Sequence, residues 1–167
     1  MDLRATQQPL KDRYRADPTA AQITLRASSG RADAPVACAV DLGRAIYEAQ
    51  AHEGVGGAGT AACSGDLLLG ALAACAQLTC QMVAAAMGID ATRIEVFVEG
   101  DLDLRGTLGL ARDVSAGFAA IRVRFEVEDP TATPEQLASL RAKTERYCTV
   151  LQTLTRPPQL ETEFNHA

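Results

Sequence analysis

The sequence predicts a single α+β domain in which helices pack on one face of an antiparallel sheet. Residues 94–98 and 121–127 alternate apolar and polar side chains, which is typical of strands with one buried and one exposed face. Residues 67–87 carry no formal charge and are rich in alanine, which predicts a helix enclosed on all sides. A chain of 167 residues has the length of one domain and can bury a core without metal or disulfide bonds.

The N-terminal part is expected to hold two strands and one short helix. Residues 1–9 are expected to form a flexible arm, and a short helix is expected at 10–16. Apolar residues then predict strands at 23–27 and 36–42. The glycine-rich residues 51–62 lead into the long helix but lack the lysine of a phosphate-binding loop, so we interpret them as a connection.

The long helix has clear signals at both ends. Ser64 can cap its N-terminus, Asp66 complements the helix dipole, and Gly88 can end it in a left-handed conformation. Its 21 residues (67–87) reach the length of a membrane span. Because alanine is its commonest residue, Gln77, Thr79 and Gln81 interrupt it and basic flanks are missing, we expect a core helix and no membrane association.

A second helix is expected at 133–154, followed by a weak strand at 160–164. Thr133, Pro134 and Gln136 form the pattern of a capping box with proline in the first turn. One apolar stripe follows, made by Leu137, Leu140, Tyr147, Cys148, Leu151 and Leu154.

Charge and composition exclude several classes of protein. The chain has 16 basic and 21 acidic residues, a net charge of −5 and a pI near 5.0, which argues against nucleic acid or an anionic membrane as partner. His52 and His166 are the only histidines, too few for a zinc site, so we expect no metal. Residues 1–15 are polar without an apolar segment, so we expect a cytoplasmic protein with reduced thiols.

The five cysteines are the candidate reactive groups, and no two form a C-x-x-C pair. Cys38 and Cys80 are expected to pack in the core, and Cys148 lies on the apolar stripe of the second helix. Cys63 stands just before the helix cap, where a thiol feels the dipole. Cys75 lies in mid-helix, where both packing and reactivity stay open. A thiolate there would need an arginine or histidine beside it.

In combination these features resemble the OsmC/Ohr family of thiol-dependent peroxidases. The resemblance rests on the alanine-rich helix around 73–79, the alternating strands within 93–128, and the second cysteine segment 144–150. Residues 62–69 and 99–109 are similar to a less characterised branch of the family.

The resemblance implies an OsmC-like fold in which antiparallel sheets wrap around the long central helices of an intertwined homodimer. It implies that Cys75 is the peroxidatic cysteine that attacks an organic hydroperoxide, and that Cys148 resolves the product as a disulfide. Arg44 is the best match to the arginine that holds the thiolate. No bound cofactor is implied, because an external dithiol reductant, possibly a lipoylated protein, completes the cycle.

The chain departs from the family pattern at one position. Where the family carries a glutamate about ten residues before the cysteine, this sequence has Gly65, with Asp66 beside it; residues 52–53 are another place for an acidic group. Two alternatives therefore stay open. One is a non-enzymatic dimer that binds a small apolar ligand. The other makes Cys63 and Cys75 the working pair.

Overall fold

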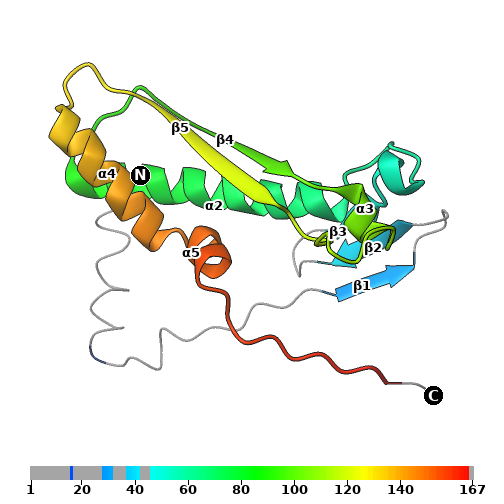
Figure 1. Cartoon of the computed structure of the whole chain (residues 1–167). Coiled ribbons are helices and arrows are strands. Elements are labelled where there is room, and N and C mark those ends of the chain that lie inside the picture. Colours follow the sequence, from blue (N-terminus) through cyan, green and yellow to red (C-terminus); the bar gives the residue numbers. More distant parts are fainter. Residues whose placement is uncertain (1–15, 17–27, 32–36, 42–45, 166–167) are drawn as a thin grey trace. The chain divides into compact units, whose positions relative to one another are not determined.

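The computed structural model describes residues 16, 28–31, 37–41 and 46–165 (Figure 1). It contains helices together with antiparallel strands, which confirms the α+β class. The elements are β1 (Ser28–Arg31), β2 (Ala37–Asp41), β3 (Ile46–Gln50), the 3₁₀ turn η2 (Glu53–Val55), α2 (Ser64–Met87), β4 (Arg93–Asp101), α3 (Leu104–Thr107), β5 (Ala120–Glu128), α4 (Pro134–Tyr147) and α5 (Thr149–Thr155).

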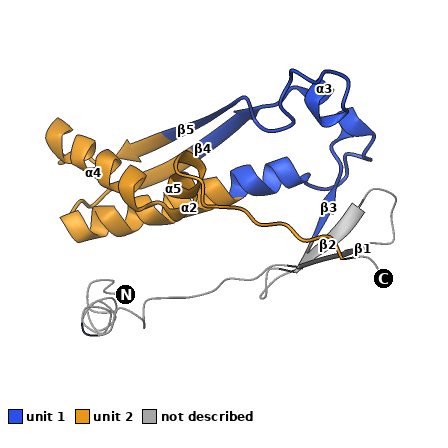
Figure 2. Cartoon of the chain, turned by 60° about the horizontal axis from the view of Figure 1, so that its bottom comes forward, with its two compact units in different colours: residues 1–70, 97–124 blue, residues 71–96, 125–167 orange. Residues whose placement is uncertain are grey.

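The chain divides into two compact units, coloured separately in Figure 2. Unit 1 holds residues 1–70 and 97–124, and unit 2 holds residues 71–96 and 125–167. Helix α2 and strands β4 and β5 each run from one unit into the other. The expectation that residues 1–167 form one domain, with residues 1–9 as an arm, stays a prediction.

Unit 1 contains an antiparallel sheet with the strand order β1-β2-β3. Strand β2 confirms the strand predicted at 36–42, whereas 23–27 lies outside the described residues. Strand β3 was not predicted, because its sequence begins with two apolar residues, Ile46 and Tyr47, and so shows no clear alternation. The helix expected at 10–16 falls outside the described residues except for Ala16.

Strands β4 and β5 are neighbours in a second sheet and run antiparallel. The Thr92 N–H donates to the Glu128 carbonyl at one end (2.8 Å), and the Ala119 N–H donates to the Asp101 carbonyl at the other (2.8 Å). Along β5 exposed and half-buried side chains alternate as far as Phe125. The strands expected at 94–98 and 121–127 are therefore confirmed and extend beyond both predictions.

The core of unit 2 lies between the C-terminal half of α2, α4 and the adjoining ends of the two strands. Leu140 of α4 is 2% exposed, and the Gln77 side chain of α2 donates to the Ile94 carbonyl of β4 (2.7 Å). Helix α2 begins at Ser64 and ends before Gly88, whose φ of 71° is the left-handed stop that the sequence predicts. The buried cluster consists of Cys80, Val83, Ala84, Ile89 and Leu140.

Two predictions in the C-terminal part are wrong. The helix expected at 133–154 is broken at Cys148 into α4 and α5, which Figure 1 shows as two separate helices. The apolar repeat continues through the break, so periodicity alone could not reveal it. Residues 157–165 form no strand, and Phe164 is 94% exposed, because alternation marks a strand's face but supplies no partner strand.

Candidate active site

The structure brings Cys75 and Cys148 together within unit 2. Cys75 lies half-buried in the middle of α2, and Cys148 lies between α4 and α5 with no exposed surface. Their side chains are hydrogen-bonded to each other. Two thiols that are far apart in sequence thus lie next to each other, and the roles that the resemblance implies for them stay predictions.

The break in the helix places backbone donors beside this pair. Cys148 has an extended conformation (φ −70°, ψ 108°). It is both the C-cap residue of α4 and the N-cap residue of α5. Its own N–H donates to the Thr144 carbonyl (2.9 Å). The N–H groups of Thr149 and Val150 begin α5, and both hydrogen-bond to the Cys75 sulfur. An uninterrupted helix would have used the Thr149 and Val150 N–H groups for its own bonds to the preceding turn.

Opposing effects set the pKa of the Cys75 thiol. Burial raises it, but hydrogen bonds from the Val150 N–H, the Cys148 thiol, the Thr79 hydroxyl and the Thr149 N–H lower it. The hydrogen bonds prevail, and the pKa of Cys75 lies below the ordinary value of 9.0. All of these donors are uncharged, so the described part of the chain stabilises the thiolate without the arginine or histidine that the sequence argument required.

The pKa of Cys148 moves in the opposite direction. Burial raises it, and the neighbouring Cys75 raises it further because the Cys148 thiol donates to the Cys75 sulfur. Cys75 therefore ionises first, while Cys148 keeps its proton. A thiolate beside a protonated thiol is an arrangement that can attack an electrophile and then close a disulfide.

Cys80 belongs to the core, as predicted. It is 2% exposed and sits in the buried cluster of unit 2, where the Thr144 hydroxyl contacts its sulfur. Burial raises the pKa of its thiol. Cys80 is therefore a packing residue, although it lies only five positions after Cys75.

In unit 1, Cys63 and Asp66 form a separate arrangement at the start of α2. The Asp66 carboxylate accepts the Cys63 N–H (2.9 Å), and this bond with a second one from the Cys63 thiol lowers the pKa of Asp66. Asp66 thus acts at the N-terminus of α2, as the dipole argument predicted. A Cβ on Gly65 would lie 3.3 Å from Phe118 and 3.4 Å from the Cys63 sulfur, so this position has little room for a glutamate.

Several predicted residues are not tested by this geometry. Arg44 and His166 lie outside the described residues, and of Cys38 only the backbone is described, opposite Ala49 of β3. The His52 ring accepts the Gly54 N–H (3.0 Å) in the η2 turn. In the ranges that the structure describes, no cluster of His, Cys, Asp or Glu could hold a metal ion.

The sequence analysis missed three residues of the site: Thr79, Thr149 and Val150. Thr79 follows Cys75 by four residues, and this spacing could have suggested a shared helix face. The Thr149 and Val150 N–H groups carried no such signal, because only the break at Cys148 turns them toward Cys75.

Fold and site together define an α+β protein with one thiol in a central helix and a second at a helix junction. A sequence profile of the family described as OsmC-like protein matches residues 57–163, and the chain belongs to this family. A comparison with curated proteins found no match.

Solved structures with the same fold include members of this family. An OsmC-like protein from Mycoplasma pneumoniae is 14% identical, with a TM-score of 0.67 over 81% of this chain and 90% of that one. An organic hydroperoxide resistance protein from Elizabethkingia anophelis is 20% identical, with a TM-score of 0.59 over 81% and 90%. Another from Legionella pneumophila is 17% identical, with a TM-score of 0.59 over 80% and 90%.

Proposed function

We propose that this protein reduces organic hydroperoxides to alcohols, with Cys75 as the peroxidatic and Cys148 as the resolving cysteine. The pairing of the two thiols carries the proposal, because Cys75 ionises first and Cys148 keeps a proton beside it. Membership of the OsmC-like family is consistent with such a role. Two structurally similar proteins are described as organic hydroperoxide resistance proteins.

The proposed reaction balances with these two residues and one external dithiol. The Cys75 thiolate attacks the outer peroxide oxygen, an S–O bond forms, and the O–O bond breaks. The alkoxide takes the proton of the Cys148 thiol and leaves as the alcohol. The Cys148 thiolate then attacks the Cys75 sulfenic acid, releasing hydroxide and closing a disulfide. A dithiol supplies two electrons and two protons, which restores both thiols.

Peptide mass spectrometry after one equivalent of cumene hydroperoxide tests this assignment. We expect the reduced protein to lose two hydrogens, mapped to a Cys75–Cys148 disulfide. Cys75→Ser should abolish peroxide consumption. Cys148→Ser should still permit the first attack, slowed by the loss of the thiol that protonates the alkoxide, and should let Cys75 overoxidise because no resolving thiol remains. Cys80→Ser is the matched control, because its thiol lies on the same helix but in the core.

Two other results would contradict the proposal. A disulfide between Cys63 and Cys75 would make those two the working pair. Five unmodified thiols would favour the non-enzymatic alternative, a protein that binds a small apolar ligand.

The assembly and the reductant are further parts of the proposal. Helix α2 is long and apolar enough to cross a membrane, and its Leu78 is 59% exposed in the single chain. We propose that a second copy of the chain covers this surface in a homodimer rather than a membrane doing so. A dithiol such as a lipoylated protein would reduce the disulfide in the cytoplasm, and Arg44 would assist in holding the thiolate.

A further inference from the structure

Thr79 is a buried polar residue next to the reactive thiol. It is 5% exposed, and among the described residues only Thr79 and Thr144 are both polar and buried. Because it follows Cys75 by four positions in α2, the two side chains share one face of the helix. A buried hydroxyl is costly unless it has a hydrogen-bond partner.

The partner of the Thr79 hydroxyl is the Cys75 sulfur. Threonines in helices often donate to the carbonyl four residues earlier, as Thr153 and Thr155 of α5 do (2.9 Å each). At Thr79 the hydroxyl bonds to the side chain four residues earlier. Since a thiolate can only accept hydrogen bonds, the hydroxyl must be the donor when Cys75 is ionised.

Thr79 and the other donors to the Cys75 sulfur come from different structural elements. The Thr149 and Val150 N–H groups and the Cys148 thiol all come from the α4–α5 junction. Cys148 also gives up its proton and changes its bonding during the proposed reaction. Thr79 alone comes from the helix that carries Cys75, and its hydroxyl is not consumed.

We propose that Thr79 is a catalytic residue whose hydroxyl donates to the Cys75 sulfur and keeps it ionised and in place for attack. The role of Thr79 in catalysis rests on the proposed peroxidase function. The hydrogen bond itself, however, can be tested without any peroxide.

The test measures the alkylation rate of Cys75 against pH by peptide mapping in three variants. In Thr79→Val, which keeps the shape but loses the hydroxyl, we expect the Cys75 pKa to rise and alkylation at pH 7 to slow by about tenfold, as for the loss of one hydrogen bond to a charged group. Thr79→Ser retains the hydroxyl and should remain close to wild type. Thr144→Val is the matched control, because it removes an equally buried hydroxyl that contacts Cys80.

Each outcome bears on one proposal. A Cys75 profile in Thr79→Val that matches wild type and Thr144→Val would overturn the role of Thr79, whether or not wild type consumes peroxide. A raised pKa in Thr79→Val, restored in Thr79→Ser, would support it even if wild type consumes no peroxide, in which case the peroxidase proposal alone fails. If Thr79→Val folds poorly, Thr79→Ala replaces it, because alanine lacks the hydroxyl and is smaller than valine. The pKa of Cys75 must then rise by the same amount in Thr79→Ala.

Discussion

At Cys75, burial and hydrogen bonding act on the thiol in opposite directions. Burial disfavours the thiolate, and four donors favour it. Burial and the neighbouring Cys75 raise the pKa of Cys148, so in the proposed reaction Cys75 is the nucleophile and Cys148 the proton donor. The identity of each residue as cysteine does not decide these roles, because the surrounding donors decide them.

This asymmetry predicts separate pH profiles for the two thiols. Since the pKa of Cys75 is lowered, its alkylation in the folded protein should reach half its maximum below pH 9.0. The thiol of Cys148, with a raised pKa and no exposed surface, should stay unmodified at that pH. Peptide mapping of the folded protein at a series of pH values measures both. In denaturant the two profiles should converge, and convergence in the folded protein as well would contradict the assignment of roles.

The candidate site was only partly predictable from the sequence. Cys75 and Cys148 could be paired through a family resemblance, because their segments carry recognisable residues. The Thr149 and Val150 N–H groups could not be found, since a backbone donor has no side chain to mark it. Their availability depends on the conformation of Cys148, which local sequence preference does not fix.

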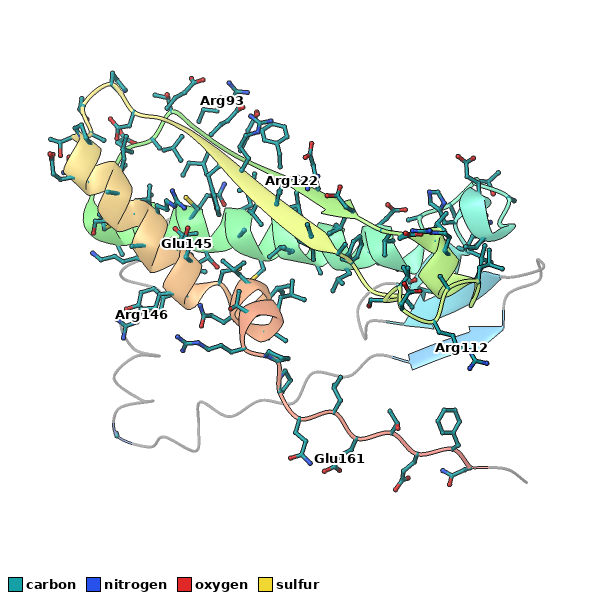
Figure 3. All side chains as sticks on the ribbon, in the orientation of Figure 1. Arg93, Arg112, Arg122, Glu145, Arg146 and Glu161 are labelled. Carbon is teal, nitrogen blue, oxygen red and sulfur yellow. The ribbon has the colours of Figure 1, made fainter. Side chains whose placement is uncertain are left out.

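At the scale of elements, the junction between α4 and α5 matters most. The Gln152 side chain of α5, half-buried, donates to the Glu145 carbonyl in the last turn of α4 (2.8 Å). Glu145 and Arg146 lie at this end of α4 in Figure 3. The Gln152 bond holds α5 against α4 and so helps to keep the Val150 N–H beside Cys75.

Gln152→Ala tests the contribution of this bond. We expect a loss of about 1 kcal/mol in the free energy of unfolding, measured by urea titration, and a Cys75 pKa closer to 9.0. Thr153→Ala is the control, because its exposed hydroxyl bonds only within α5. Equal Cys75 profiles in both variants would show that the Gln152 bond does not position the donors.

Elements with strong local signals were predictable, and those that depend on distant partners were not. Gly88 ends α2 and the Thr133 capping box begins α4, as predicted, whereas Ser64, predicted as the cap of α2, is the first residue of the helix itself. The capping box forms as predicted, with the Thr133 hydroxyl accepting the Gln136 N–H (3.3 Å) and the Gln136 side chain accepting the Thr133 N–H (2.8 Å). The strand expected at 160–164 failed, since pairing needs a second strand that local pattern cannot supply.

At the scale of the whole molecule, the single chain leaves large apolar side chains of α2 exposed. Leu78 is 59% exposed and Leu68 is 38% exposed, on a helix that carries no charged residue after Asp66. Full burial of a leucine side chain stabilises a protein by about 1.5–3 kcal/mol relative to leaving it in water. A second copy of the chain would recover that free energy.

Leu78→Glu should therefore disrupt the assembly. We expect the mass of a dimer for wild type and of a monomer for the variant in light scattering, because a carboxylate would be buried in the contact. Leu110→Glu is the control, since Leu110 is 73% exposed and lies away from α2 in the sequence. A monomeric wild type would contradict the homodimer.

The complete burial of Cys148 would also determine which sulfur of the disulfide the reductant attacks. In a Cys75–Cys148 disulfide, attack on the Cys148 sulfur would release the more acidic thiol and so have the better leaving group. That sulfur belongs to a residue with no exposed surface, whereas Cys75 is half-buried. Because an unreachable atom cannot be attacked at any rate, access outweighs the leaving group. The reductant's mixed disulfide should therefore form on Cys75, and a slender dithiol should outpace a bulky one.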